Sequence, residues 1–129
     1  MTQEEKELLL IDLSGRLGYG IKVWEPNGTG GIVIIKGIVG NTCYFETNPV
    51  YGNSCAIDNV KPYLRPMSSM TEEEKEEYRN ECNKVLSMPF KINGPYPIVD
   101  WLNAHHFDHR GLIPMGLALE APKDMYKTE

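Results

Sequence analysis

The stretch Ile32-Val33-Ile34-Ile35-Lys36-Gly37-Ile38-Val39 decides the fold that the sequence predicts. Its run of β-branched side chains is typical of a strand, and apolar residues occupy both of its faces. An open sheet with one face in water would not tolerate this pattern, so the stretch favours a curled sheet or small barrel covered by helices. Gly37 is suited to the bend or bulge that such curling requires.

Short strand candidates flank this stretch on both sides. Residues 21–24 precede it, and residues 42–47, 55–57 and 60–64 follow it, with turn-forming residues between them. Strands this closely spaced and joined by hairpins predict an antiparallel meander or an SH3-like barrel.

A helix is predicted before the strands. Thr2 and Glu5 have the spacing of a capping box, in which each side chain accepts a hydrogen bond from an otherwise unpaired amide of the first turn. We therefore expect a helix over about residues 3–13. Its leucines form one stripe, but Leu8 and Ile11 extend beyond it, so the pattern predicts packing on both flanks.

Two further helices are predicted after the strands. Thr71 and Glu74 form a second capping box and begin a helix over residues 72–86. Pro97 suits the first turn of a third helix that runs to about residue 106, beyond which residues 112–119 form a short helix or an irregular segment. The apolar faces of these two helices contain Tyr78, Cys82, Val85 and Leu86 in the first, and Ile98, Trp101, Leu102 and His105 in the second.

Together these elements predict a single α+β domain over residues 1–129. It has an N-terminal helix (1–17), a β-rich core (20–64) and a helical C-terminal part (71–129). The predicted core is a small curled antiparallel sheet or SH3-like barrel, packed with the N-terminal helix and two or three C-terminal helices.

Composition and charge narrow the function classes. Thirteen basic against eighteen acidic residues give a formal charge of −5, which disfavours generic nucleic-acid binding. The three cysteines are odd in number and have no CxxC spacing, which predicts free thiols in a cytoplasmic protein. The acidic start of the chain does not resemble a signal peptide, and no apolar run predicts a membrane span.

Two long motifs carry a resemblance to a known family. They are Lys61-Pro62-Tyr63-Leu64-Arg65-Pro66-Met67-Ser68-Ser69-Met70-Thr71, and Asp100-Trp101-Leu102-Asn103-Ala104-His105-His106-Phe107-Asp108 with Arg110-Gly111-Leu112-Ile113 after it. With them, the chain resembles a family of short uncharacterised proteins from gut Bacteroides genomes and their phages. The resemblance implies no activity, cofactor or catalytic residue.

One polar cluster has the composition of a metal site. His105, His106, Asp108 and His109 place imidazoles and a carboxylate within five residues and overlap part of the HxHxDH signature of metallo-β-lactamase-like hydrolases. Ala104 stands where that signature begins with histidine, and the chain has no histidine elsewhere to complete a dinuclear site. The family that the chain resembles has tyrosine in place of His109, which weakens the metal interpretation.

A structural role accounts for the same residues one by one. His105 shares the apolar helix face with Trp101, His106 lies near a helix end that favours positive charge, and Asp108 suits a turn or cap. We therefore expect Trp101 and His105 to anchor the C-terminal third, and no catalytic, cofactor or metal residue is assigned. The acidic run at residues 72–77 is compatible with a docking face, although carboxylates also favour the start of a helix.

The sequence thus predicts a non-enzymatic accessory or protein-binding module with an unknown protein partner and no membrane association. A metal-assisted hydrolase that uses the histidine and aspartate cluster is the first alternative. A small barrel that binds nucleic acid is the second, with the net charge against it.

Overall fold

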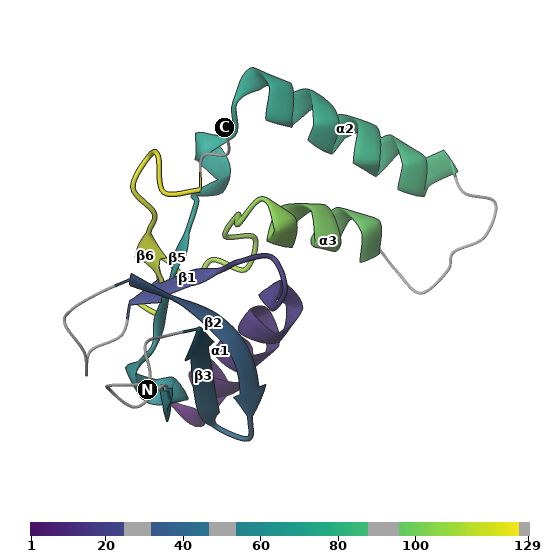
Figure 1. Cartoon of the computed structure of the whole chain (residues 1–129). Coiled ribbons are helices and arrows are strands. Elements are labelled where there is room, and N and C mark those ends of the chain that lie inside the picture. The colour runs from purple at the N-terminus through teal and green to yellow at the C-terminus, as the bar shows by residue number, and fades with distance from the viewer. Residues whose placement is uncertain (25–31, 47–53, 88–95, 127–129) are drawn as a thin grey trace.

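The structure is a computed structural model that describes residues 1–24, 32–46, 54–87 and 96–126 (Figure 1). It has an α+β fold, in which helices pack on a six-stranded sheet of order β4-β3-β2-β1-β5-β6. The strands are β1 (Lys22–Trp24), β2 (Ile32–Val39), β3 (Thr42–Glu46), β4 (Ser54–Ala56), β5 (Lys61–Leu64) and β6 (Leu119–Glu120). The 3₁₀ helices η1 (Ile57–Asn59) and η2 (Met67–Ser69) flank β5.

The observed sheet differs from the curled sheet or SH3-like barrel that the sequence predicted. Strands β1 to β5 pair antiparallel as predicted, but β6 joins β5 in parallel, so the sheet is mixed. It is uncurled and open, with β4 and β6 at its edges, and does not close into an SH3-like barrel. The register of β2 against β3 shifts between Ile35 and Gly37, which confirms an irregularity at this glycine.

The apolar residues of β2 explain why no closure is needed. Ile35 is buried at 2% exposure, whereas Ile32 and Val39 are 51% and 69% exposed. The expectation that apolar side chains on both faces must all be covered was therefore wrong. A folded protein leaves much apolar surface in water, so single exposed side chains at strand ends do not force a sheet to close.

Helix α1 (Gln3–Arg16) packs on one face of the sheet (Figure 1), where Leu9 and Leu13 join the core with Val23 and Ile35. Its capping box forms as predicted: the Glu5 N–H donates to the Thr2 hydroxyl at 3.0 Å, and the Thr2 N–H donates to Glu5 at 2.8 Å. Leu9 and Leu13 are fully buried, but Ile11 is 57% exposed, so α1 is not covered on both flanks. The helix continues through Gly15, beyond the predicted end.

Helices α2 (Glu72–Ser87) and α3 (Tyr96–Ala104) lie side by side at one end of the sheet (Figure 1). The capping box of α2 forms as predicted, since Thr71 and Glu74 exchange hydrogen bonds at 3.0 and 3.1 Å. Tyr78 packs against Trp101 with ring centroids 5.7 Å apart. The side chains of Val85 and Leu86, expected on the same stripe, lie outside the described part of the chain.

The remaining C-terminal residues are mostly irregular and pack through Leu112 and Leu117, which are buried. They lead to β6 and then to residues 121–126, which we call the strap. Within the residues that the structure describes, no helix is both long enough and apolar enough to cross a bilayer.

None of the three cysteines forms a disulfide, as predicted. Cys43 and Cys55 face each other on β3 and β4 and are buried, and burial raises the pKa of Cys43 to about 12, with Cys55 adding to the shift. Such thiols behave as small core hydrophobes.

Candidate functional site

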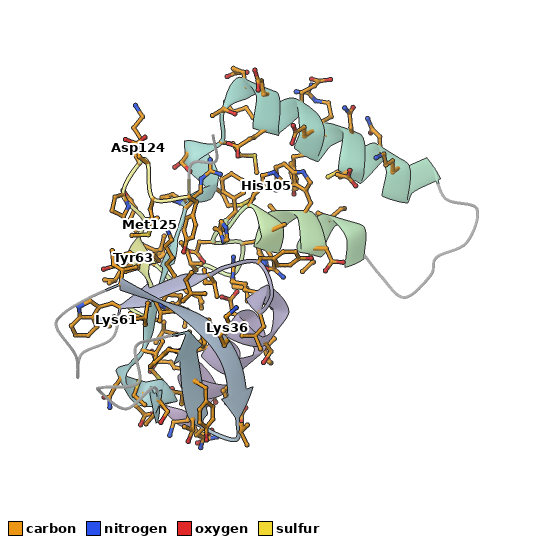
Figure 2. All side chains as sticks on the ribbon, in the orientation of Figure 1. Lys36, Lys61, Tyr63, His105, Asp124 and Met125 are labelled. Atoms are coloured by element: carbon orange, nitrogen blue, oxygen red, sulfur yellow. The ribbon has the colours of Figure 1, made fainter. Side chains whose placement is uncertain are left out.

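A cavity of about 1120 Å³ lies between the start of α2, the end of α3 and the strap. Acidic residues of α2 line one side, residues of β6 and the strap line another, and His105 and His106 lie at the end of α3. Figure 2 shows His105 beside α3 and Asp124 in the strap. This cavity is the candidate functional site because it holds the most unusual side chain of the described structure.

That side chain is His106, at the end of α3. The Phe107 N–H donates to the Leu102 carbonyl at 2.9 Å and the His106 N–H donates to the Asn103 carbonyl at 3.0 Å, which is the pattern of a Schellman motif. His106 occupies its left-handed position with a φ of 64° and is the one non-glycine residue of the described chain with positive φ. Glycine usually fills this position, because a Cβ atom there is strained.

The ring of His106 is held in place but makes no hydrogen bond. It stacks on the ring of Tyr126 with centroids 3.7 Å apart. Tyr126 is itself fixed, since its hydroxyl accepts from the Lys22 N–H at 2.9 Å and donates to the Tyr63 carbonyl at 2.7 Å. His106 is 8% exposed, its Nδ1 is buried without a partner, and neither ring nitrogen has a hydrogen bond within the described residues.

Burial keeps this ring neutral. Desolvation, with a smaller contribution from the positive charge of Arg16, lowers the pKa of His106 to about 4. At neutral pH the imidazole therefore has one nitrogen that donates and one that accepts, and the buried Nδ1 has no hydrogen bond within the described residues.

His105 has a different environment. Its Nδ1 donates to the Trp101 carbonyl at 2.8 Å, and its ring stacks on the Trp101 ring with centroids 4.1 Å apart. Its Nε2 lies 3.8 Å from Glu77 of α2. Trp101 is only half-buried and packs toward α2, so the two residues join α3 to α2 rather than to the main core.

Asp108 and His109 are occupied by structural hydrogen bonds. Asp108 accepts from the Leu112 and Ile113 N–H groups at 2.8 and 2.9 Å, which fixes the turn after α3. His109 Nε2 lies 2.8 Å from Asn103 Oδ1, and Asn103 donates to a backbone carbonyl of α1. Asn103 is buried.

The structure thus separates the four residues of the predicted metal cluster. His105 packs on Trp101, His106 on Tyr126, and Asp108 and His109 bond to the backbone and to Asn103. In the described ranges, no group of three or more His, Cys, Asp or Glu side chains is placed to hold a metal ion.

Arg65 and Glu74 form an ion pair in the cavity wall that the sequence did not predict. Two Arg65 nitrogens donate to the Glu74 carboxylate at 2.6 and 2.7 Å, and the guanidinium lies over the Phe107 ring, 4.2 Å from its centroid. Burial opposes ionisation of Glu74, but the hydrogen bonds from Arg65 and Thr71 outweigh it and lower the pKa of Glu74. This pair attaches the start of α2 to the end of β5.

A second unpredicted group joins α1 to the residues that follow α3. Asp12 and Arg16 of α1 are fully buried, with Arg16 Nε 2.8 Å from the Asp12 carboxylate and Arg110 Nε 3.2 Å from it. Arg16 also donates to the Phe107 carbonyl at 2.7 Å. The sequence did contain a signal for this buried pair. Asp12 and Arg16 are four residues apart and lie beside the apolar stripe of α1, whereas an ion pair on the surface would lie on the opposite side of the helix.

Comparisons with known proteins found no counterpart. No family model matches the chain, and no curated protein or solved structure is significantly similar to it.

Proposed function

We propose that the protein is a non-enzymatic binding module that receives an extended segment of a partner protein in the cavity beside His106. The observation that carries this proposal is the state of His106 itself: a strained backbone conformation combined with a buried, neutral ring whose Nδ1 has no hydrogen bond within the described residues. Strained residues persist where the surrounding structure fixes them, and they cluster at binding and catalytic sites.

The surroundings of His106 give the ring a fixed direction. Glycine would remove the strain at this position, yet the imidazole stands there, stacked on a tyrosine whose hydroxyl bonds to β1 and β5. A preorganised donor and acceptor of this kind loses little side-chain entropy when a ligand binds. These features support recognition of a polar group in the cavity.

The size and edges of the cavity support a polypeptide ligand. Its volume of about 1120 Å³ exceeds the roughly 300–1,000 Å³ of most small-molecule pockets. Edge strand β6 contributes Glu120 to the lining. Because the Ala121 N–H donates to the Leu64 carbonyl of β5, the backbone groups of Glu120 point away from β5, where an extended segment can pair with them.

A binding role accounts for His106 better than a catalytic one. A base with a pKa of about 4 accepts protons poorly at neutral pH, and His106 has no hydrogen-bonded nucleophile or orienting carboxylate within the described residues. We favour the binding module over the hydrolase because no group of three or more potential ligands converges in the described residues, and over a nucleic-acid-binding barrel because the sheet is open. The proposal includes a cytoplasmic location. It also includes membership of the family of short proteins from Bacteroides genomes and their phages that the sequence resembles.

The test is selection of binders from a displayed library of random peptides against the full chain. We expect selected peptides to lose binding to His106→Gly, while binding to Tyr44→Ala, an exposed change on β3 outside the cavity, stays unchanged. His106→Gly should fold, because the relieved backbone strain and the lost ring stack are each about 1 kcal/mol and oppose each other. A library without binders, or binders indifferent to His106→Gly, would contradict the proposal.

A further inference from the structure

The cavity carries an excess of negative charge. Its lining contains five carboxylates, those of Glu73, Glu74, Glu77, Glu120 and Asp124, against the two cations Arg65 and Lys123, a formal charge of −3 with neutral histidines. Since Arg65 and Glu74 neutralise each other, four carboxylates and Lys123 remain, and the carboxylates form two rims. Glu73 and Glu77 make the rim on α2, and Glu120 and Asp124 make the rim beside the strap.

The acidic residues of α2 divide into two sets. Glu72, Glu76 and Glu81 each form an ion pair with a basic residue three positions later in the helix, namely Lys75, Arg79 and Lys84. Glu73 and Glu77, which line the cavity, have no lysine or arginine partner in the described chain. Their spacing of four residues places both on one face, so the unneutralised charge of α2 is concentrated toward the cavity.

Close to Glu77 lies His105, which carries a positive charge only when it is protonated. Its Nε2 lies 3.8 Å from the Glu77 carboxylate, and this contact is an ion pair only in the protonated state. The Glu77 side chain is 56% exposed and therefore accessible to a ligand. Two carboxylates on one helix face, in a cavity that Glu120 and Asp124 also line, complement a cationic group placed among them.

His106 provides the independent second feature. It is more than nine-tenths buried, lines the same cavity and has no hydrogen bond to its ring nitrogens in the described structure. A lysine or arginine side chain has only donors, so it requires acceptors. A neutral imidazole nitrogen and the rim carboxylates are acceptors of this kind.

An anionic ligand does not fit the same site. The start of α2 borders the cavity, but the Thr71 hydroxyl and the Glu74 carboxylate already accept hydrogen bonds at this end of the helix. The Arg65 guanidinium is paired with Glu74. The helix start and Arg65 are therefore already occupied, and the net negative charge of the lining opposes an anion even though Lys123 also lines the cavity.

Building on the proposed function, we infer that the partner segment bound in the cavity is basic, with a lysine or arginine side chain between the α2 rim and the rim beside the strap. The charge complementarity carries this inference, and His106 supplies the neutral acceptor at the end of α3.

The experiment measures fluorescence anisotropy with three labelled peptides of one length, in which the same positions hold lysine and arginine, glutamine, or glutamate. We expect the basic peptide alone to bind, and its affinity to fall at higher salt. The double variant Glu73→Gln and Glu77→Gln should weaken binding about tenfold, the loss of two exposed charge pairs. The matched control is Glu72→Gln with Glu76→Gln, which removes the same charge from the same helix outside the cavity.

The outcomes separate this inference from the proposed function. If the control weakens binding as much as the cavity variant, the attraction is general to an acidic helix and the inference is wrong. If the glutamine or glutamate peptide binds as tightly and in a His106-dependent manner, the inference is wrong but the binding module stands. If no library-selected or synthetic peptide depends on His106, the proposed function fails as well.

Discussion

At His106 the backbone conformation favours glycine, whereas the surroundings of the ring favour an aromatic side chain. The φ of 64° belongs to the end of α3, and the stack on Tyr126 connects that end to β1 and β5 through the tyrosine hydroxyl. The strain of a non-glycine residue in this region is about 1 kcal/mol, similar to the contribution of one aromatic stack. Because histidine adds so little stability at this position, we attribute its presence to binding.

The pH dependence of unfolding tests the neutral state of His106. Its folded-state pKa of about 4 lies below the ordinary value of 6.5, so between these values only the unfolded chain takes up a proton at this residue. The free energy of unfolding should therefore fall as the pH is lowered from 6.5 toward 4, by up to about 3 kcal/mol from this residue. Burial also lowers the pKa of His109, which adds a loss of the same sign.

The measurement is urea unfolding of the wild type and of His106→Asn at about pH 7 and about pH 5. Asparagine tolerates the left-handed conformation but does not titrate, so the variant should lose most of the difference in stability between the two pH values. An equal difference in wild type and variant would show that His106 is not the group responsible.

At the scale of elements, a cluster of rings joins α2 to α3. Trp101 lies at the centre of it, with centroids 5.7 Å from Tyr78, 4.1 Å from His105 and 5.9 Å from Phe107. The α2 helix has few other apolar contacts in the described structure, because most of its side chains are charged and exposed. The position of the α2 rim relative to His106 therefore depends on this cluster.

We expect Trp101→Ala to destabilise the protein by about 2 kcal/mol. This is less than the roughly 3–5 kcal/mol of a tryptophan in a closed core, because Trp101 is only half-buried. Urea unfolding followed by circular dichroism measures the loss, with Tyr44→Ala on β3 as the control for an exposed aromatic residue. If both variants lost the same stability, the cluster would not hold α2 in place.

At the scale of the molecule, one buried ionic network connects the N-terminal helix with the C-terminal third. The Asp12 carboxylate binds Arg16 of its own helix and Arg110 far along the chain, and Arg16 reaches the Phe107 carbonyl. Asn103 adds a further link by donating to the Gly15 carbonyl at 3.2 Å. These contacts place the turn after α3, and hence His106, against α1.

We expect Asp12→Asn to cost about 3–5 kcal/mol of stability, because it leaves the Arg16 guanidinium buried without its counter-charge. Replacing both residues, Asp12→Leu with Arg16→Met, should be less damaging than the single change, because no buried charge remains. Denaturant unfolding of both variants and of Glu72→Gln, an exposed control, measures the difference. A single variant as stable as the control would show that the network does not hold the fold together.

The sequence by itself determined the elements whose signals are local. The capping boxes at Thr2 and Thr71 and the β-branched run of β2 predicted elements close to those observed, because caps and strand patterns depend on neighbours within a few residues. The α+β class follows from the same signals.

Only the tertiary structure decided how these elements meet. The parallel addition of β6, the open sheet, the Arg65–Glu74 pair and the stack of His106 on Tyr126 join residues that their own neighbours do not specify. The histidine and aspartate cluster shows the limit most clearly. Its members are adjacent in sequence, yet the left-handed turn at His106 sends successive side chains toward Trp101, Tyr126, the Leu112 amide and Asn103. Composition and spacing predict which groups are available, but backbone direction determines whether they converge.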